Sequence, residues 1–224
     1  MSATGSEQPH PEASDAMDID TGARRHRLAL WLVLALALLL RLVFVLTLGD
    51  APLWHDAREY DALARELLAS GQYRLDDGTP TAFWPPGYPG FLATIYGLVF
   101  AQPLAARLLQ GVLGALTCWL LYGIARQLAD RRVALLSALG LAIYPLLIYA
   151  TGTLYPVILV TFLWAALLRL LLAARRESHG RFLLAGALGG GLVLTTPSAG
   201  PALLGVALWC LWYFGQLGAA HPLR

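Results

Sequence analysis

Acidic and basic side chains gather in the segment WHDAREYDALA, residues 54–64, which directly follows an apolar run. Five titratable or charged residues lie within seven positions: His55, Asp56, Arg58, Glu59 and Asp61. A carboxylate positioned in this way can accept a proton as a general base. Asp56 and Glu59 also fit a capping box, in which the first acid caps a helix and the second bonds back to it. The residues alone leave both interpretations open.

The pattern from Asp56 onward predicts a helix. Apolar side chains recur at helical spacing and form one stripe: Tyr60, Leu63, Ala64, Leu67 and Leu68. Gly71 predicts the end of this helix, and RLDDGTP predicts a turn-rich connector. An amphipathic helix of this kind is expected to lie on a membrane surface with its stripe toward the lipid.

The composition indicates a membrane protein. Of the 224 residues, 58% are hydrophobic and 13% are charged, which is too apolar for a soluble domain. The net charge of +2 indicates no nucleic-acid partner. Cys118 and Cys210 each lie inside an apolar run, which favours buried thiols over a disulfide.

The apolar runs predict an all-α, polytopic transmembrane helix bundle with about six or seven hydrophobic segments. Six runs are long enough to cross a bilayer, and a seventh is shorter: residues 28–48, 104–125, 133–151, 156–174, 182–197 and 201–217, and then 87–101. Residues 1–23 are polar and acidic and predict a disordered cytoplasmic tail. Residues 24–218 are expected to form the transmembrane module, and 219–224 a second tail.

The placement of arginine predicts the orientation of the module. Three clusters stand out: Arg24, Arg25 and Arg27; Arg126, Arg131 and Arg132; Arg175, Arg176 and Arg181. The positive-inside rule puts all three in the cytoplasm only if residues 87–101 dip into the outer face without crossing. Residues 49–103 then form one outer-face loop, which in a bacterial cell lies on the periplasmic side of the inner membrane.

The segment FWPPGYPGF, residues 83–91, interrupts regular structure. Its three prolines suppress backbone hydrogen bonding, and its two glycines permit tight bends. One interpretation is an ordinary helix entry, with Trp84 and Tyr88 in the aromatic interface belt. The other is irregular backbone at membrane depth, which is tolerated only where it is buried in protein or lines a cavity.

Two arginines belong to the apolar runs. Arg41 lies inside the first, where a mid-membrane arginine costs about 2.5–3.5 kcal/mol on insertion scales. It is expected either to snorkel to the outer headgroups or to lie near a lipid phosphate. Arg107 opens the run 104–125 and fits either an interface anchor or a phosphate ligand. His55, next to Asp56, could tune the site, but it is interpreted as an isolated, exposed histidine. No histidine has the spacing of a metal ligand.

Four weak motifs in a fixed order carry a family resemblance. They are an acid soon after the first apolar run, then EYDALARELLASGQY, PPGYPGFLATIYGLVF and AARLLQGVLGALTCWLLYGIARQL. In this order the chain resembles the GT-C superfamily of integral membrane glycosyltransferases, from residue 28 to residue 215. The branch that it resembles, family 39-like, contains protein O-mannosyltransferases and bacterial aminoarabinose transferases.

The resemblance implies transfer of a hexosyl or pentosyl group from a polyprenyl-phosphate donor to a lipid, glycan or protein acceptor at the outer face. It implies that Asp56 is the catalytic acid of the first outer loop and that Arg107 contributes to the lipid-phosphate site. Arg41, Glu59, Tyr60 and Tyr88 are further candidates for substrate binding. The lipid bilayer and the lipid-linked donor are the implied partners. No certain cofactor is implied, and metal dependence stays open.

Three departures from relatives favour an alternative function. Many relatives carry an acid where this chain has Tyr155, and often an arginine where it has Thr196. Relatives are also commonly about twice as long, which predicts a fragment or a partner chain that supplies a C-terminal half. The alternative is a non-catalytic membrane subunit or a lipid-binding relative of such a transferase. A secondary transporter is disfavoured, because no inverted repeat is visible.

Overall fold

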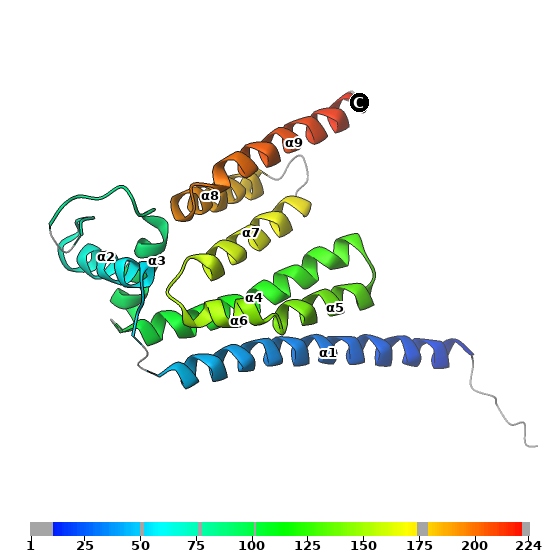
Figure 1. Ribbon diagram of the computed structural model, residues 1–224. Helices are drawn as coiled ribbons and strands as arrows, with labels where there is room; N and C mark the ends of the chain where they lie inside the picture. The colour runs from blue at the N-terminus through cyan, green and yellow to red at the C-terminus, as the bar shows by residue number, and fades with distance from the viewer. Residues whose placement is uncertain (1–10, 50–51, 76–77, 101, 174–178, 221–224) are drawn as a thin grey trace, which may run out of the picture.

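The computed structural model describes residues 11–49, 52–75, 78–100, 102–173 and 179–220. Within these residues the regular structure is helical, apart from an isolated β-bridge between Arg74 and Pro80, which confirms the all-α class. The helices, labelled in Figure 1, are α1 (Pro11–Leu48), α2 (Asp56–Ser70), α3 (Gly87–Leu98), α4 (Pro103–Leu128), α5 (Arg131–Ala142), α6 (Pro145–Gly152), α7 (Val157–Leu172), α8 (His179–Thr195) and α9 (Ala199–Ala220).

Two helices in the described part of the chain are long and apolar enough to cross a bilayer, namely Arg24–Leu48 of α1 and the whole of α4. Together α5 and α6 pass the same test as a pair bent by 46°, which fits a broken span or a re-entrant loop. The apolar helix α7 has only 16 residues, fewer than the roughly 20 that a bilayer core needs. The chain is therefore an integral membrane protein with two or three candidate spans, fewer than the six or seven apolar segments of the sequence.

The termini of the chain are only partly described. Helix α1 begins at Pro11, inside the segment expected to be a disordered tail, and residues 1–10 lie outside the described range. Glu12, Ala13, Ala16 and Met17 favour a helix, and the helix continues through Gly22 into the first span. At the other terminus α9 extends to Ala220, and residues 221–224 are not described.

The bend between α5 and α6 has a chemical cause at Pro145. Proline has no N–H, so the carbonyl of Leu141 loses its helical donor. Arg41 of α1 supplies donors at the break: its Nη2 donates to the carbonyl of Leu141 at 3.3 Å, and its Nη1 donates to that of Ala142 at 3.1 Å. Nη1 also donates to the carbonyl of Ala37 in its own helix at 2.9 Å. Inside a membrane such carbonyls have no water to bond, so a buried arginine can stabilise the break.

The helices run back and forth, so their ends gather in two places. Helices α2 and α3 lie together with the end of α1 and the starts of α4 and α7, and we call this the α2–α3 end (Figure 1). The α4–α5 turn, which contains Arg126 and Arg131, and the start of the span of α1 lie at the opposite end. Arg175 and Arg176 are outside the described residues. That residues 87–101 do not cross the membrane stays a prediction.

The apolar stripe of α2 faces protein, which corrects the expectation that it lies against lipid. Ala57, Tyr60 and Ala64 form a core with α3 and with the ends of α4 and α7 at the α2–α3 end. A bond from Tyr96 Oη to Asp61 Oδ1, 2.5 Å, joins the two helices at the edge of this core. Since α3 carries its own apolar face, the two helices cover much of each other's apolar surface.

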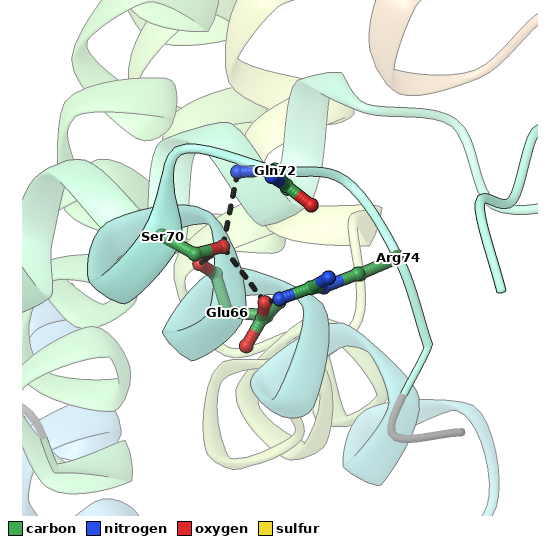
Figure 2. Close-up of polar contacts among 4 residues, drawn as sticks. All are labelled: Glu66, Ser70, Gln72 and Arg74. Carbon is green, nitrogen blue, oxygen red and sulfur yellow. Dashed lines mark hydrogen bonds and ion pairs between the residues drawn. The ribbon is translucent and has the colours of Figure 1, made fainter. Parts of the chain in front are cut away.

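The end of α2 is tied to the connector that follows it. As predicted, Gly71 ends the helix in the left-handed region, at φ 70°. Figure 2 shows Glu66, whose Oε1 accepts hydrogen bonds from Ser70 Oγ at 2.7 Å and from Arg74 Nε at 2.8 Å. Ser70 Oγ also accepts from the backbone N–H of Gln72 at 3.2 Å. The hydrogen bonds from Ser70 and then from Arg74 lower the pKa of Glu66. Together with the bond from Gln72, they hold the connector against α2.

Candidate functional site

The charged segment enters α2 through an unusual backbone. His55 occupies the N-cap position with φ 48° and ψ −132°, and its side chain makes no capping hydrogen bond. Asp56 is the first residue of the helix, so the capping box expected of Asp56 and Glu59 is wrong. The reason is the turn at His55, which starts the helix one residue earlier than a cap at Asp56 requires. Asp56 is exposed, and Glu59 is half-buried in the first turn.

The conformation of His55 is strained. Among the described residues it is the only non-glycine with a positive φ, and the others are Gly49, Gly71 and Gly78. A side chain in this region costs of order 1–3 kcal/mol and is retained where the surroundings require it, often at functional sites. His55 is exposed, as predicted. No sequence signal distinguished it from an ordinary surface histidine.

A groove of about 330 Å³ opens at the α2–α3 end, and we call it the Arg107 groove. It is lined by Phe44 and Leu48 of α1, residues 52–55 and Ala57, Arg107 of α4, and Tyr149 with residues 152–155. The groove thus joins the end of the first span to the start of α2 and to the loop between α6 and α7. Segments that are far apart in the sequence meet around one cation.

Arg107 is the charged residue in the lining of this groove. Its side chain is 3% exposed, and Nη1 donates to the carbonyl of Gly49 at 3.2 Å. The guanidinium therefore lies where the first span ends. A buried arginine beside apolar walls attracts phosphate and can bind it through two parallel hydrogen bonds.

Asp56 lies beside the groove through its contact with Tyr155. The backbone of Asp56 lies close to the phenol of Tyr155, which lines the groove. Burial, and then the negative charge of Asp56, raise the pKa of Tyr155, so its hydroxyl remains a hydrogen-bond donor. Tyr60 packs edge-on against Tyr155, with ring centroids 6.3 Å apart. Its pKa is raised by burial, then by Asp56 and Tyr155.

Tyr88 lies behind the groove and not at an interface. It is fully buried and contacts Tyr60, with ring centroids 5.2 Å apart. Its hydroxyl donates to Gln110 Oε1 at 2.8 Å. The segment PPGYP is therefore a helix entry, the first of the two interpretations: Pro86 is the N-cap of α3, and Gly87, Tyr88 and Pro89 form its first turn. Tyr88 is nevertheless buried in protein and does not lie in an interface belt. Gln110 was not singled out from the sequence, although a glutamine within the apolar run of α4 was a usable signal.

Arg41 is placed differently from both expectations. It is fully buried, so it does not snorkel to the headgroups, and it is not among the residues that line the Arg107 groove. Its guanidinium is bonded to the carbonyls at the α5–α6 break. The structure thus brings Asp56, Tyr60 and Tyr88 together around Tyr155 and Gln110, and it leaves Arg41 in the helix core.

Other features of the described chain offer less chemistry. A larger cavity of about 770 Å³ lies between α7, α8 and α9, but the described residues that line it are apolar or small, with Cys210 the most polar. No group of three His, Cys, Asp or Glu among the described residues is placed to hold a metal ion. The Arg107 groove, by contrast, combines a cation, a neighbouring carboxylate and a volume suited to a small polar group.

Comparison with known families gives one match. Residues 84–218, more than half of the chain, match the model described as dolichyl-phosphate-mannose-protein mannosyltransferase. The matched segment contains Tyr88, Arg107, Gln110 and Tyr155, whereas Asp56 precedes it. No curated protein and no solved structure matches the chain significantly.

Proposed function

Because the chain belongs to the dolichyl-phosphate-mannose-protein mannosyltransferase family, we propose that it transfers a sugar from a polyprenyl-phosphate donor to an acceptor at the outer face of the membrane. Membership of this family implies a glycosyltransferase that depends on a lipid-phosphate sugar. The outer face, the site residues and the course of the reaction are the proposal. The observation that carries it is the Arg107 groove, in which a buried cation lies at the end of a span and beside a helix that begins with an acid.

The roles of the two main residues follow from their chemistry. Asp56 accepts the proton of an acceptor hydroxyl, whose oxygen attacks the anomeric carbon of the donor sugar. The bond between this carbon and the phosphate oxygen breaks, and the lipid phosphate leaves with the electron pair. Arg107 stabilises the negative charge that develops on the phosphate. The proton thus ends on Asp56, and no metal is needed for charge balance in this scheme.

The other candidates have supporting roles. Tyr155 presents a protonated hydroxyl to the groove and packs against Tyr60, so both shape the wall that faces the sugar. Glu59 lies one turn after Asp56 and remains a candidate for substrate contact. Arg41 supports the fold of the broken span, and this role replaces the expected contact with the lipid phosphate.

The membrane orientation is inferred from charge. The α4–α5 turn with Arg126, Arg131 and Arg132 lies opposite to the α2–α3 end (Figure 1). By the positive-inside rule the arginine-rich end is cytoplasmic, and the groove then opens at the outer face. In a bacterium this location is the periplasmic side of the inner membrane, with the N-terminus in the cytoplasm.

A second function is favoured by one observation at the same groove. Many relatives are expected to carry an acid where this chain has Tyr155, and this tyrosine occupies the groove wall next to Asp56. A chain with fewer acids could bind the lipid phosphate without turnover, as a non-catalytic subunit that works with a partner chain. Under this alternative the phosphate still depends on Arg107, but no sugar is transferred.

A binding experiment distinguishes three cases: a transferase, a subunit that binds the lipid phosphate without turnover, and a chain without a lipid-phosphate site. The chain, reconstituted in nanodiscs, is titrated with undecaprenyl phosphate, and the same samples are assayed for loss of radiolabelled sugar from a polyprenyl-phosphate donor in the presence of membrane extract. Arg107→Ala should weaken binding at least about tenfold, and Arg107→Lys should restore it only in part, because lysine lacks the bidentate geometry. Arg126→Ala at the opposite end is the matched control.

Each result of this experiment has a distinct meaning. Binding with sugar loss supports the transferase, and binding without sugar loss supports the subunit. Equal affinity in the wild type and in both Arg107 variants would exclude the groove as the phosphate site.

A further inference from the structure

Gln110 joins three segments behind the Arg107 groove. It lies on α4 one turn after Arg107, and its side chain is fully buried. Its Oε1 accepts from Tyr88 Oη at 2.8 Å, and its Nε2 donates to the carbonyl of Thr151 at 3.0 Å and to that of Thr153 at 2.8 Å. Both amide hydrogens and the amide oxygen are therefore used, as a buried amide requires.

The two carbonyls lie at the end of α6, where no further helical turn supplies N–H donors. Helix α6 ends at Gly152, so the carbonyls of its last turn have no intrahelical donor. The neighbouring residues Thr153, Leu154 and Tyr155 line the groove on the side of α6 and α7. Gln110 thus caps a short helix and at the same time anchors one wall of the groove to the helix that carries Arg107.

We propose that Gln110 is a positioning residue that sets the separation between this wall and Arg107, with Tyr88 fixing the orientation of its amide. This inference rests on the proposed function, because the groove is taken to be the donor site. Gln110 touches no substrate. Gln110 acts through the backbone that holds Tyr155 beside Asp56. The inference also gives a role to Tyr88, which lies too deep to contact a ligand.

The consequence of losing Gln110 is a mobile wall. Gln110→Met keeps the length of the side chain but leaves the carbonyls of Thr151 and Thr153 and the hydroxyl of Tyr88 without their partner. Tyr88→Phe is milder, because it removes one hydrogen bond and leaves both carbonyls paired. If the methionine variant does not fold, the phenylalanine variant still tests the idea.

The wall can be measured without catalysis. Spin labels at Gln102→Cys and Tyr149→Cys, both at exposed positions, report the distance between the start of α4 and the end of α6 in a background that lacks the two native cysteines. We expect a narrow distance distribution in the parent chain, a broad or shifted one with Gln110→Met, and a smaller change with Tyr88→Phe. The control Gln127→Met removes an amide that lies against Leu172 at the opposite end of α4 and should leave the distribution unchanged.

Binding of undecaprenyl phosphate to the unlabelled chain gives the second readout. Its Kd should rise at least about tenfold with Gln110→Met, at a temperature where the variant remains folded, and stay unchanged with Gln127→Met. Unaltered distances and Kd in both Gln110→Met and Tyr88→Phe would overturn the inference. If the parent chain binds no polyprenyl phosphate, the proposed function fails, while the distances still decide whether Gln110 positions the wall.

Discussion

His55 is the described non-glycine residue whose backbone departs most from ordinary geometry, and it directly precedes the acid proposed as the base. The conformation turns the chain from the end of the first span into α2, with Asp56 at the first helical position. A glycine would make the same turn without steric cost. The imidazole at this position also lines the groove.

The strain at His55 predicts a difference between two substitutions. Alanine keeps a Cβ in the unfavourable region, whereas glycine removes it. His55→Gly should therefore be more stable than His55→Ala by about 1 kcal/mol or more, measured as unfolding in detergent. Both variants lack the imidazole, so the comparison isolates the backbone. Equal stability of the two would show that the backbone at this position is not strained.

At the scale of elements, the broken span depends on a contact between α1, α4 and α5. Gly114 of α4 leaves room for Arg41, and a Cβ at this glycine would lie 2.8 Å from Arg41 Cδ. Arg41 cannot move aside easily, because its guanidinium is bonded to carbonyls of both α1 and α5. The space at Gly114 therefore allows Arg41 to reach the carbonyls at the helix break that Pro145 causes.

Gly114→Ala should destabilise the protein by about 1–3 kcal/mol through overpacking against Arg41. Gly140→Ala is the matched control, since a Cβ at Gly140 meets nothing within 4 Å and should be neutral or slightly stabilising. Combining Gly114→Ala with Arg41→Ala should remove most of the penalty of the glycine substitution. Thermal unfolding of the four variants measures the coupling, and additive effects would mean that Gly114 does not serve Arg41.

The sequence predicted elements with long or clear periodicity better than it predicted their neighbours. The first span, α4, and α2 with its end at Gly71 follow from apolar runs and turn residues. The burial of α2 against α3 does not, because two amphipathic stripes are as compatible with lipid as with each other. Pro145 marks a break in the sequence, but its partner Arg41 bonds to a carbonyl 101 residues away, and no local pattern connects them.

The same limit applies to the site. Asp56 and Arg107 were found by residue type and by resemblance, whereas their positions around one groove come from the tertiary structure. The helix start at His55 depends on a backbone conformation that residue types do not reveal. Gln110 is an intermediate case: its polarity within an apolar helix was visible, but its partners, the carbonyls at the end of α6, were not.

At the scale of the whole molecule, the account requires the groove and the arginine-rich turn to lie on opposite sides of the membrane. In a chain without Cys118 and Cys210, a cysteine at Thr79, in the connector after α2, should react with a membrane-impermeant thiol reagent in intact cells. A cysteine at Ala129, in the α4–α5 turn, should react only after the membrane is opened. Ser178, a third informative position in the sequence, lies outside the described residues.

Labelling of both positions in intact cells would mean that the bilayer does not separate the two ends. Labelling of Ala129→Cys alone would reverse the orientation and put the groove in the cytoplasm.

The central claim is that Asp56 acts as the base of a sugar transfer at the Arg107 groove, and Asp56→Asn tests it most directly. Asp56 is exposed and is not the N-cap of α2, so the amide should leave expression and thermal stability nearly unchanged. An amide accepts no proton at working pH, and positioned acid–base groups contribute typically about 10²–10⁴-fold. We expect transfer from a polyprenyl-phosphate sugar to fall at least about a hundredfold, with Glu59→Gln milder and binding of undecaprenyl phosphate retained. Near-normal transfer by a well-folded Asp56→Asn variant would contradict the account.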